Sequence, residues 1–353
     1  MTDDVVENNS PAKASRLLDA VPVLRNKSPR WQYGGGGLIV LLLVALFLSI
    51  YWSLEPSHFD VREATQQRLG KDADKVIGAV TINTVITIGE TLLHKPGGYL
   101  SNDLMPPGLF MDNMPNWEWG VLTQLRDIAR GLRNDLTRSQ SQSMEDPDLS
   151  KAEPQFNINN QKWMFPSPEK EYQVGLNHIE SFLKRMVDPG HTDAQFFARA
   201  DNLSGWLDLA GKRLGSLSQR LRSSVGQARV NTDLAGDSAA DKATPTPDDM
   251  MVRTDWFKID DVFFEARGTC WALLHLLEAI EADFSSVLVD KNALVSLRQI
   301  IRELEPTQNT VWSPMILNGR GFALVANHSL VMASYISRAN AALIDLKNLL
   351  SQG

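Results

Sequence analysis

The sequence contains a single cysteine, Cys270, so no disulfide can form within the chain. It also lacks an excess of basic residues, because 35 Lys and Arg stand against 42 Asp and Glu, a net charge of −7. Proteins that bind nucleic acids carry a basic surface that matches the phosphate backbone. The charge balance therefore argues against a nucleic-acid partner. The lack of disulfides does not exclude a location outside the cytoplasm when the core is large.

A further absence is that of charge between Gly34 and Leu54, a run of 21 residues. At about 1.5 Å per residue, a helix of that length reaches about 32 Å, against a hydrocarbon core of about 30 Å. The eleven Leu, Ile, Val and Phe residues between Leu38 and Ile50 favour insertion into lipid by roughly 3 to 7 kcal/mol. A helix buried in a soluble core would carry a polar face, and this run has none. We therefore predict a transmembrane helix at Gly34–Leu54, with the lipid bilayer as its partner.

Basic residues precede this run and predict its orientation. Arg25, Lys27 and Arg30 have no acidic residue between them and the run, which favours a cytoplasmic N-terminus. Residues 1–33 are predicted to form a disordered cytoplasmic tail, and residues 55–353 a periplasmic domain of a single-pass protein of the bacterial inner membrane. The alternative is a cleavable signal peptide, whose apolar stretch is about 7–15 residues long and ends in a small-x-small site. The longer run favours an uncleaved anchor.

Strand signals are scarce in this sequence, and helical ones are frequent. In six stretches apolar residues recur at alternating spacings of three and four, as in amphipathic helices. Each buried Leu, Ile or Phe contributes roughly 1.5–3 kcal/mol, so each apolar stripe needs a partner surface. We predict an all-α fold, in which the transmembrane helix is followed by a large extracytoplasmic helical bundle with coiled-coil-like packing. The six stretches are 122–136, 176–186, 196–221, 256–284, 294–304 and 322–350.

Three segments depart from this pattern. Residues 76–93 include a β-branched run that would also suit a strand, but we favour a helix at Ala73–Leu93 because Lys95-Pro96-Gly97-Gly98 supplies a stop after it. Residues 139–168 and 230–253 are polar, contain proline, and are predicted to be flexible loops. The second loop either divides the domain into halves or connects helices that share one core.

The sequence offers no constellation of catalytic or metal-binding residues. No two of the six histidines have the i, i+4 spacing of ligands on one helical face. Cys270 and His328 lie on apolar stripes, which indicates burial in the core. Ser181 and Lys184 match the Ser-x-x-Lys pattern of penicillin-binding proteins, but the companion motifs are missing. We therefore predict a protein without catalytic residues, cofactor or metal, and an enzyme acting on cell-wall substrates stays the least favoured alternative.

The most distinctive stretch is 95–120, which is rich in Met, Phe, Trp and Pro. Such a loop either folds onto the bundle or offers an apolar contact surface, and we favour packing onto the bundle. It is also the place where a contact with a partner protein is most expected. The candidate contact residues are Met105, Leu109, Phe110, Met111, Met114, Trp117 and Trp119.

Two motifs in this stretch carry a resemblance to a known family. Residues 95–103 read Lys-Pro-Gly-Gly-Tyr-Leu-Ser-Asn-Asp, and residues 116–120 read Asn-Trp-Glu-Trp-Gly. Together with the apolar run at Gly34–Leu54, they resemble a Gram-negative bacterial family known only as a domain of unknown function (2333 type). The resemblance implies a single-pass inner-membrane protein over most of the chain. It implies no activity, because the family offers no catalytic residues to carry over.

These observations lead to three functional hypotheses. The favoured one is a non-enzymatic envelope protein that acts through protein–protein interaction, with another envelope protein or with itself as a homo-oligomer. The second is a periplasmic helical bundle that senses a ligand. The third is an enzyme active on the cell wall.

Overall fold

The computed structural model describes residues 29–72, 75–139, 144–230, 249–313, 315–319 and 324–352. It divides the chain into two units, residues 1–50 and residues 51–353. The predicted cytoplasmic tail falls largely on residues 1–28, which lie outside the described part of the chain.

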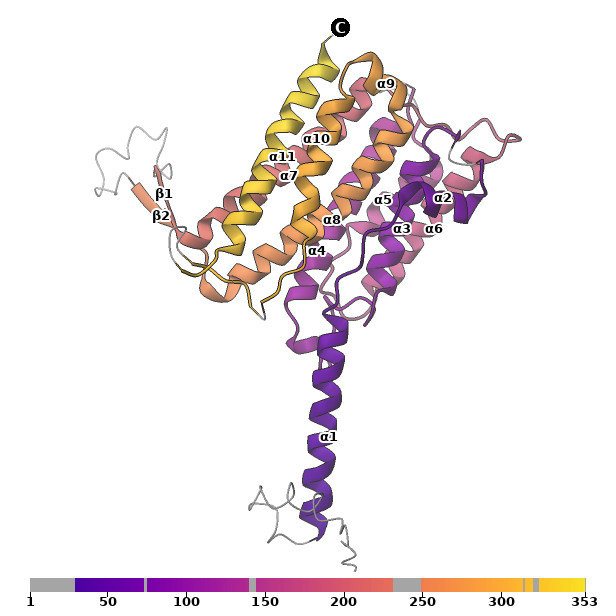
Figure 1. Ribbon diagram of the computed structural model, residues 1–353. Coiled ribbons are helices and arrows are strands. Elements are labelled where there is room, and N and C mark those ends of the chain that lie inside the picture. The colour runs from indigo at the N-terminus through magenta and orange to yellow at the C-terminus, as the bar shows by residue number, and fades with distance from the viewer. Residues whose placement is uncertain are drawn as a thin grey trace, which may run out of the picture. The chain divides into compact units, whose positions relative to one another are not determined.

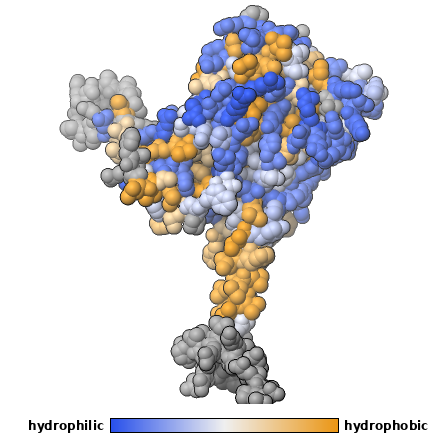
Figure 2. All heavy atoms as spheres, viewed as in Figure 1, coloured by the Kyte–Doolittle hydropathy of each residue, from blue (hydrophilic) through white to orange (hydrophobic). Residues whose placement is uncertain are grey.

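The described part of the first unit belongs to one helix, α1, Pro29–Trp52. This helix covers the predicted membrane segment except for its last two residues. Its large apolar side chains, among them Leu38, Leu41 and Phe47, are exposed, and Figure 2 shows them along the helix. Within the described residues, no helix combines the length and the hydropathy that a membrane crossing requires.

The second unit is mostly helical (Figure 1), which confirms the all-α prediction. Its only strands among the described residues are β1, Gln227–Val230, and β2, Asp249–Val252, which pair antiparallel. The long helices are α3 (Ala79–His94), α4 (Asn113–Gly131), α6 (Pro168–Val187), α7 (Ala200–Arg222), α8 (Ile259–Asp283), α10 (Leu294–Leu304) and α11 (His328–Ser351). The short helices are α2 (Val61–Leu69), η2 (Gly108–Phe110), η3 (Leu132–Leu136), α5 (Pro147–Phe156), η4 (Ser223–Val225), η6 (Trp256–Lys258), α9 (Ser285–Asp290) and η7 (Glu305–Gln308).

Helices α4 and α8 form the centre of this unit. They pack against each other, with α3 and α5 against α4 or α8 on one side, and α7 and α10 on the other. Helix α6 covers α3 and α5, and α11 covers α7 and α10. Each of the six predicted amphipathic stretches corresponds to one of these helices. The apolar stripes therefore meet in one bundle.

A single hydrophobic core runs through the bundle. It includes buried side chains from α3 and α4 before the segment 231–248 and from α8, α10 and α11 after it. Its largest fully buried side chains include Trp117 and Trp206 on one side of that segment. Trp271 of α8 packs beside Trp117, with ring centroids 5.2 Å apart. The helices before and after 231–248 therefore share one core.

Residues 76–93, for which a strand was the alternative, contain the helix α3. It begins at Ala79, after Gly78 with φ of 91°, and not at Ala73. The helix is buried on nearly all sides by α4, α6 and α8. A helix surrounded by other helices can be apolar on all faces, so its β-branched residues do not need an alternating pattern. The amide and hydroxyl of Thr81 donate to Asp283 of α8, at 2.7 and 2.6 Å. These two bonds fix the first turn of α3 to α8.

The two predicted loops differ from expectation. The first, 139–168, contains the helix α5, because Asp146 caps its N-terminus by accepting from the amides of Asp148 and Leu149. Pro147 follows the cap, where a proline suits the first turn of a helix. The second, 230–253, ends in the strand β2, and its residues 231–248 lie outside the described part of the chain.

Helices α4 and α8 touch through their backbones at two glycines. A Cβ on Gly120 of α4 would overlap the carbonyl oxygen of Glu265, and a Cβ on Gly268 of α8 would overlap that of Trp117. Any larger residue at either place would force the central helices apart. The Gly211-x-x-x-Gly215 motif of α7 is less crowded, because a Cβ on Gly215 would lie 3.8 Å from the nearest atom, Nδ2 of Asn340.

We expect Gly120→Ala and Gly268→Ala each to lower the free energy of unfolding by about 3 kcal/mol or more, because the added methyl group meets backbone that cannot move aside. Gly215→Ala is the matched control and should raise it by roughly 0.5–1 kcal/mol, since alanine favours the helix. Denaturation of the full chain in detergent, followed by circular dichroism, measures the three values. Equal tolerance of all three substitutions would contradict the close contact of α4 and α8.

Candidate functional site

The structure separates the seven candidate contact residues into three groups. Met114 and Trp117 are buried on the inner face of α4. Met105, Leu109 and Phe110 are exposed. The remaining two, Met111 and Trp119, are half-buried. The stretch therefore packs onto the bundle through α4 and leaves residues 104–111, here called the contact loop, with an apolar surface open to solvent.

A buried ion pair holds the segment before the contact loop. Nζ of Lys95, just after α3, contacts Oε1 of Glu118 in α4, and both side chains are almost completely buried. Glu118 also accepts hydrogen bonds from the amides of Leu100 and Ser101, both at 2.8 Å. The Ser101 hydroxyl donates to the same carboxylate at 2.5 Å. Burial raises the pKa of the Glu118 carboxyl, and Lys95 and these donors oppose that rise.

This ion pair joins the two motifs that carry the family resemblance. Lys95 to Ser101 belong to the first motif and Glu118 to the second. An unpaired charge at this depth would cost several kcal/mol, so each motif requires the other. Asn102 adds a bond from Nδ2 to Oε1 of Glu169 in α6, at 3.0 Å. The contact loop is thus anchored to α4 and α6 at its beginning.

Residues 53–60, which follow α1, are bound to α8 by side-chain and main-chain hydrogen bonds. We call these residues the attachment segment. Nε of Arg267 in α8 donates to Glu55 at 2.8 Å. The same guanidinium donates from Nη1 to the carbonyl oxygens of Thr307 and Asn309, at 3.1 and 2.8 Å. Arg267 is 5% exposed. A guanidinium bonded to several partners at this depth fixes both the attachment segment and the end of η7 to one helix.

Two histidines add further contacts between the attachment segment and α8. Nε2 of His58 lies 2.9 Å from Oε1 of Glu278 in α8. The amide of Phe59 donates to Nε2 of His275 at 3.1 Å, and Nδ1 of His275 donates to the carbonyl of Trp271 at 2.7 Å. The His275 ring stacks between the rings of His58 and Phe59, with centroid distances of 4.4 and 4.0 Å. This arrangement requires His275 to be neutral.

The two histidines differ in their electrostatics. Burial lowers the pKa of His275 to about 3, so it stays neutral at physiological pH. The hydrogen bond to Glu278 raises the pKa of His58 above its usual 6.5. A group whose pKa is raised by folding contributes stability that is fully present below its unfolded pKa and is lost as the pH rises through its folded pKa. The contact between His58 and Glu278 is therefore strongest in mildly acidic solution.

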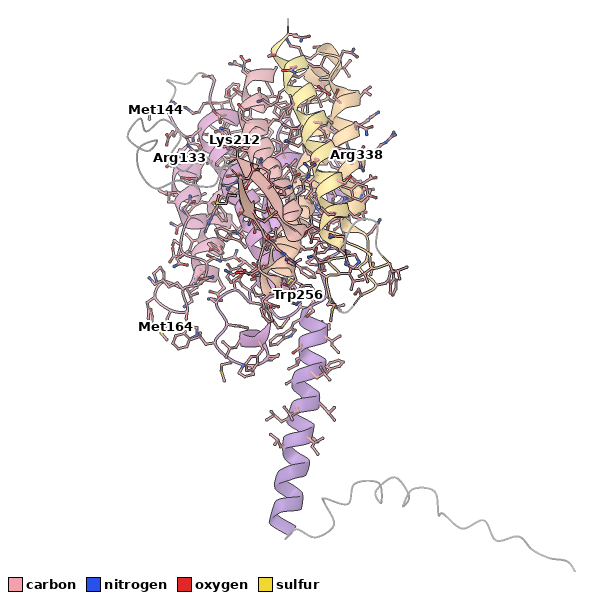
Figure 3. The ribbon with its side chains drawn as sticks, turned by 90° about the vertical axis from the view of Figure 1, so that its left-hand side faces the viewer. Arg133, Met144, Met164, Lys212, Trp256 and Arg338 are labelled. Atoms are coloured by element: carbon pink, nitrogen blue, oxygen red, sulfur yellow. The ribbon has the colours of Figure 1, made fainter. Side chains whose placement is uncertain are left out.

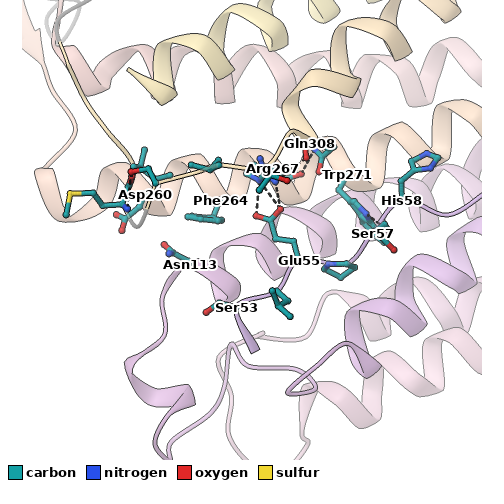
Figure 4. A pocket seen from close by; sticks show the side chains of 17 residues that line it. Ser53, Glu55, Ser57, His58, Asn113, Asp260, Phe264, Arg267, Trp271 and Gln308 are labelled. Atoms are coloured by element: carbon teal, nitrogen blue, oxygen red, sulfur yellow. Dashed lines mark hydrogen bonds and ion pairs between the residues drawn. The ribbon is translucent and has the colours of Figure 1, made fainter. Parts of the chain in front are cut away.

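A cavity of about 630 Å³ lies between the attachment segment and α8. Figure 4 shows Glu55, Phe264, Arg267 and Trp271 on its walls. The Arg267 guanidinium in the wall is already bonded to Glu55 and to carbonyl oxygens. The cavity is large enough for a small molecule, but this cation is committed to the protein itself.

The other residues that the sequence suggested for catalysis or metal binding are either hydrogen-bonded within the fold or buried in the core. The Ser181 hydroxyl donates to the carbonyl of Asn177 in its own helix, at 2.9 Å, and is exposed. Cys270 is buried, and burial raises the pKa of its thiol to about 12. Nδ1 of His328 accepts from the amide of Leu317 at 3.2 Å. Among the described residues, no group of three or more His, Cys, Asp or Glu is arranged to hold a metal ion.

Comparison with known families places the chain among uncharacterised proteins conserved in bacteria. The chain belongs to the family DUF2333, whose match extends over residues 24–353. The resemblance seen in the two motifs is therefore confirmed at the level of the family. No curated protein and no solved structure matches the chain.

We expect Glu278→Gln to lower the pKa of His58 toward its usual 6.5, because the bond that stabilises the imidazolium is weakened. In the unaltered protein, amide hydrogen exchange in the attachment segment should speed up, after correction for intrinsic rates, as the pH rises through the pKa of His58. Titration of the His58 ring signal by NMR measures the pKa in both proteins. His275 serves as an internal control, since its pKa of about 3 keeps it unchanged in this range. An identical His58 pKa in both proteins would contradict the role of Glu278.

Proposed function

We propose that this chain is a non-enzymatic, single-pass protein of the bacterial inner membrane, whose helical domain acts in the periplasm by binding another protein. The observation that carries the proposal is the contact loop, an apolar surface that a buried ion pair holds in place. Exposed apolar side chains on a rigid support are typical of interaction sites. Apolar side chains of this kind can bind a partner protein, but they supply no group for catalysis.

The membrane anchor in this proposal is supported by the sequence and by the exposure of α1. The uncharged run Gly34–Leu54 is a feature of the full sequence, and α1 is helical over nearly all of it. Most of its large apolar side chains between Leu38 and Ile50 are exposed, with Leu48 half-buried. Apolar surface in water costs about 25 cal/mol per Å², and lipid removes that cost. The basic residues before α1 favour a cytoplasmic N-terminus and a periplasmic domain.

The partner in this proposal is another envelope protein or a second copy of the chain. Leu104, Met105, Leu109 and Phe110 are the exposed apolar residues of the contact loop. The segment before the loop is bound to α4 and α6, and Asp112 after it accepts from the amide of Asn113 at the start of α4, at 2.9 Å. A loop ordered in advance loses little conformational entropy on binding. This favours recognition by a preformed surface.

A second candidate function is the sensing of a small ligand by the bundle. It is favoured by the cavity of about 630 Å³ beside the attachment segment. A ligand there would contact both α8 and the segment that leads to α1. The commitment of Arg267 to Glu55 makes this the weaker candidate, because an anionic ligand would have to displace the carboxylate.

The anchor is tested by charge in the middle of α1. An arginine at the centre of a membrane helix costs about 2.5–3.5 kcal/mol on the insertion scale, so the double variant Leu43→Arg/Val44→Arg should cancel most of the insertion free energy. We expect it to abolish the activity of alkaline phosphatase fused after Gly353, which requires export. The variant Leu43→Ala/Val44→Ala should keep that activity. A fusion of the unaltered chain that is inactive would contradict the proposed orientation.

The contact loop is tested by photocrosslinking in living cells. A photoreactive amino acid at Leu109 should form a defined crosslinked species, either with one other protein or with a second copy of the chain. The matched control is Ile344 of α11, because the two side chains have similar exposure, 50% and 52%. Mass spectrometry of the products identifies the partner. Equal and unspecific products from both positions would contradict an interaction through the contact loop.

A further inference from the structure

Among the described residues beyond α1 and the contact loop, five large aromatic side chains stand exposed on three separate segments. Their exposed fractions run from 55% for Trp163 to 94% for Trp312. We call this set the aromatic rim; it consists of Trp163, Phe165, Trp256, Phe257 and Trp312. Folding normally buries residues of this size, since each contributes 150–250 Å² of largely apolar surface. Five of them left outside the core therefore indicate contact with another apolar phase.

The three segments of the rim lie at one end of the helical unit. Figure 3 shows Met164, between the first two rim residues, and Trp256 at the same end. Nδ2 of Asn102, just before the contact loop, donates to the carbonyl of Lys162 at 3.2 Å. The segment 163–165 therefore starts beside the contact loop.

The other two segments adjoin the start of the unit. Trp256 and Phe257 line a hollow together with Met315. Met315 also lines the cavity that Ser53 and Leu54 border. Trp312 lies between Val311 and Ser313, two further residues of that cavity wall. The rim thus belongs to the end of the unit at which the chain leaves α1.

We propose that the aromatic rim lies in the headgroup region of the bilayer that α1 crosses, so that the helical domain rests on the membrane surface. This inference depends on the anchor proposed above. If Gly34–Leu54 spans the membrane, Ser53 and Leu54 lie at its boundary, and the bilayer is the surface nearest to the rim. Tryptophan and other aromatic side chains favour that boundary because their rings are partly apolar and partly polar.

A bilayer fits the rim better than a protein does. Three of the five rim residues are tryptophans, and tryptophan is enriched at the boundary between membrane and water. Asp112 and Asp260 line the same hollow as Trp256 and Phe257, whereas the exposed Lys162 and Lys258 adjoin rim residues, so the charges around the rim are mixed. The contact is therefore expected to depend on the aromatic rings and not on anionic lipid. It would also keep the contact loop at the membrane surface, where a membrane protein would meet it.

The test uses the full chain in vesicles of phosphatidylcholine. Single cysteines replace Trp163, Trp256 or Trp312, carry a polarity-sensitive dye, and are exposed to lipids with a nitroxide quencher near the headgroup; Cys270 is buried and stays in place. The matched control is Val289→Cys, because Val289 and Trp256 are both 62% exposed. Val289 lies in α9, beyond the C-terminal end of α8, whereas Trp256 precedes its start, so the 25 residues of α8 separate the two by about 37 Å.

We expect blue-shifted, strongly quenched emission from the three rim positions and emission typical of water from Val289→Cys. Adding phosphatidylglycerol to the vesicles should not increase the quenching. Rim labels that behave like the control would overturn the inference, and so would rim positions that crosslink to one protein in native membranes while staying unquenched in pure lipid. Extraction of the chain from the vesicles by alkaline carbonate would instead show that the anchor is wrong.

Discussion

The direct contact between the backbones of α4 and α8 is the constraint on which the rest of the domain depends. Gly120 and Gly268 let the two helices meet without side chains between them. Glu118, two residues before Gly120, binds the segment that leads into the contact loop. Arg267, next to Gly268, binds Glu55 in the attachment segment. Each central helix thus carries a buried charge beside the crossing, and the spacing of the helices determines where two distant parts of the chain are held.

The helical architecture could be predicted because burial on one side of a helix leaves a period in the sequence. The stripes of α7, α8 and α11 are long enough to show that period clearly. Helix α3 shows this period poorly because α4, α6 and α8 cover the helix from several directions. Only the stop signal after α3 favoured the prediction of a helix over that of a strand. The stripe predicted at 122–136 identified only the later part of α4, and Met114 and Trp117, which the sequence suggested as contact residues, lie buried in its first turns.

The contacts of the attachment segment left no local signal in the sequence. His58 and Glu278 are separated by 220 positions, and Glu55 and Arg267 by 212. Such pairs obey no spacing rule, because the fold alone brings them together. Gly268 belongs to no recognisable motif, and Gly120 ends the Asn-Trp-Glu-Trp-Gly motif, which does not reveal that this glycine touches the opposite helix. His275 and Glu278 lie three positions apart on one helix, but the residues that complete their surroundings come from the first part of the chain.

The attachment segment also decides where the helical unit begins. A shortened chain that starts at Val61 would leave the guanidinium of Arg267 among main-chain carbonyls without its carboxylate, and would leave Nε2 of His275 without the amide of Phe59. A chain that starts at Ser53 keeps both partners. In energetic terms, residues 53–60 are part of the bundle although they precede its first helix. A fragment that keeps all contacts of the bundle has its border before Tyr51, because Trp52 also packs against the core.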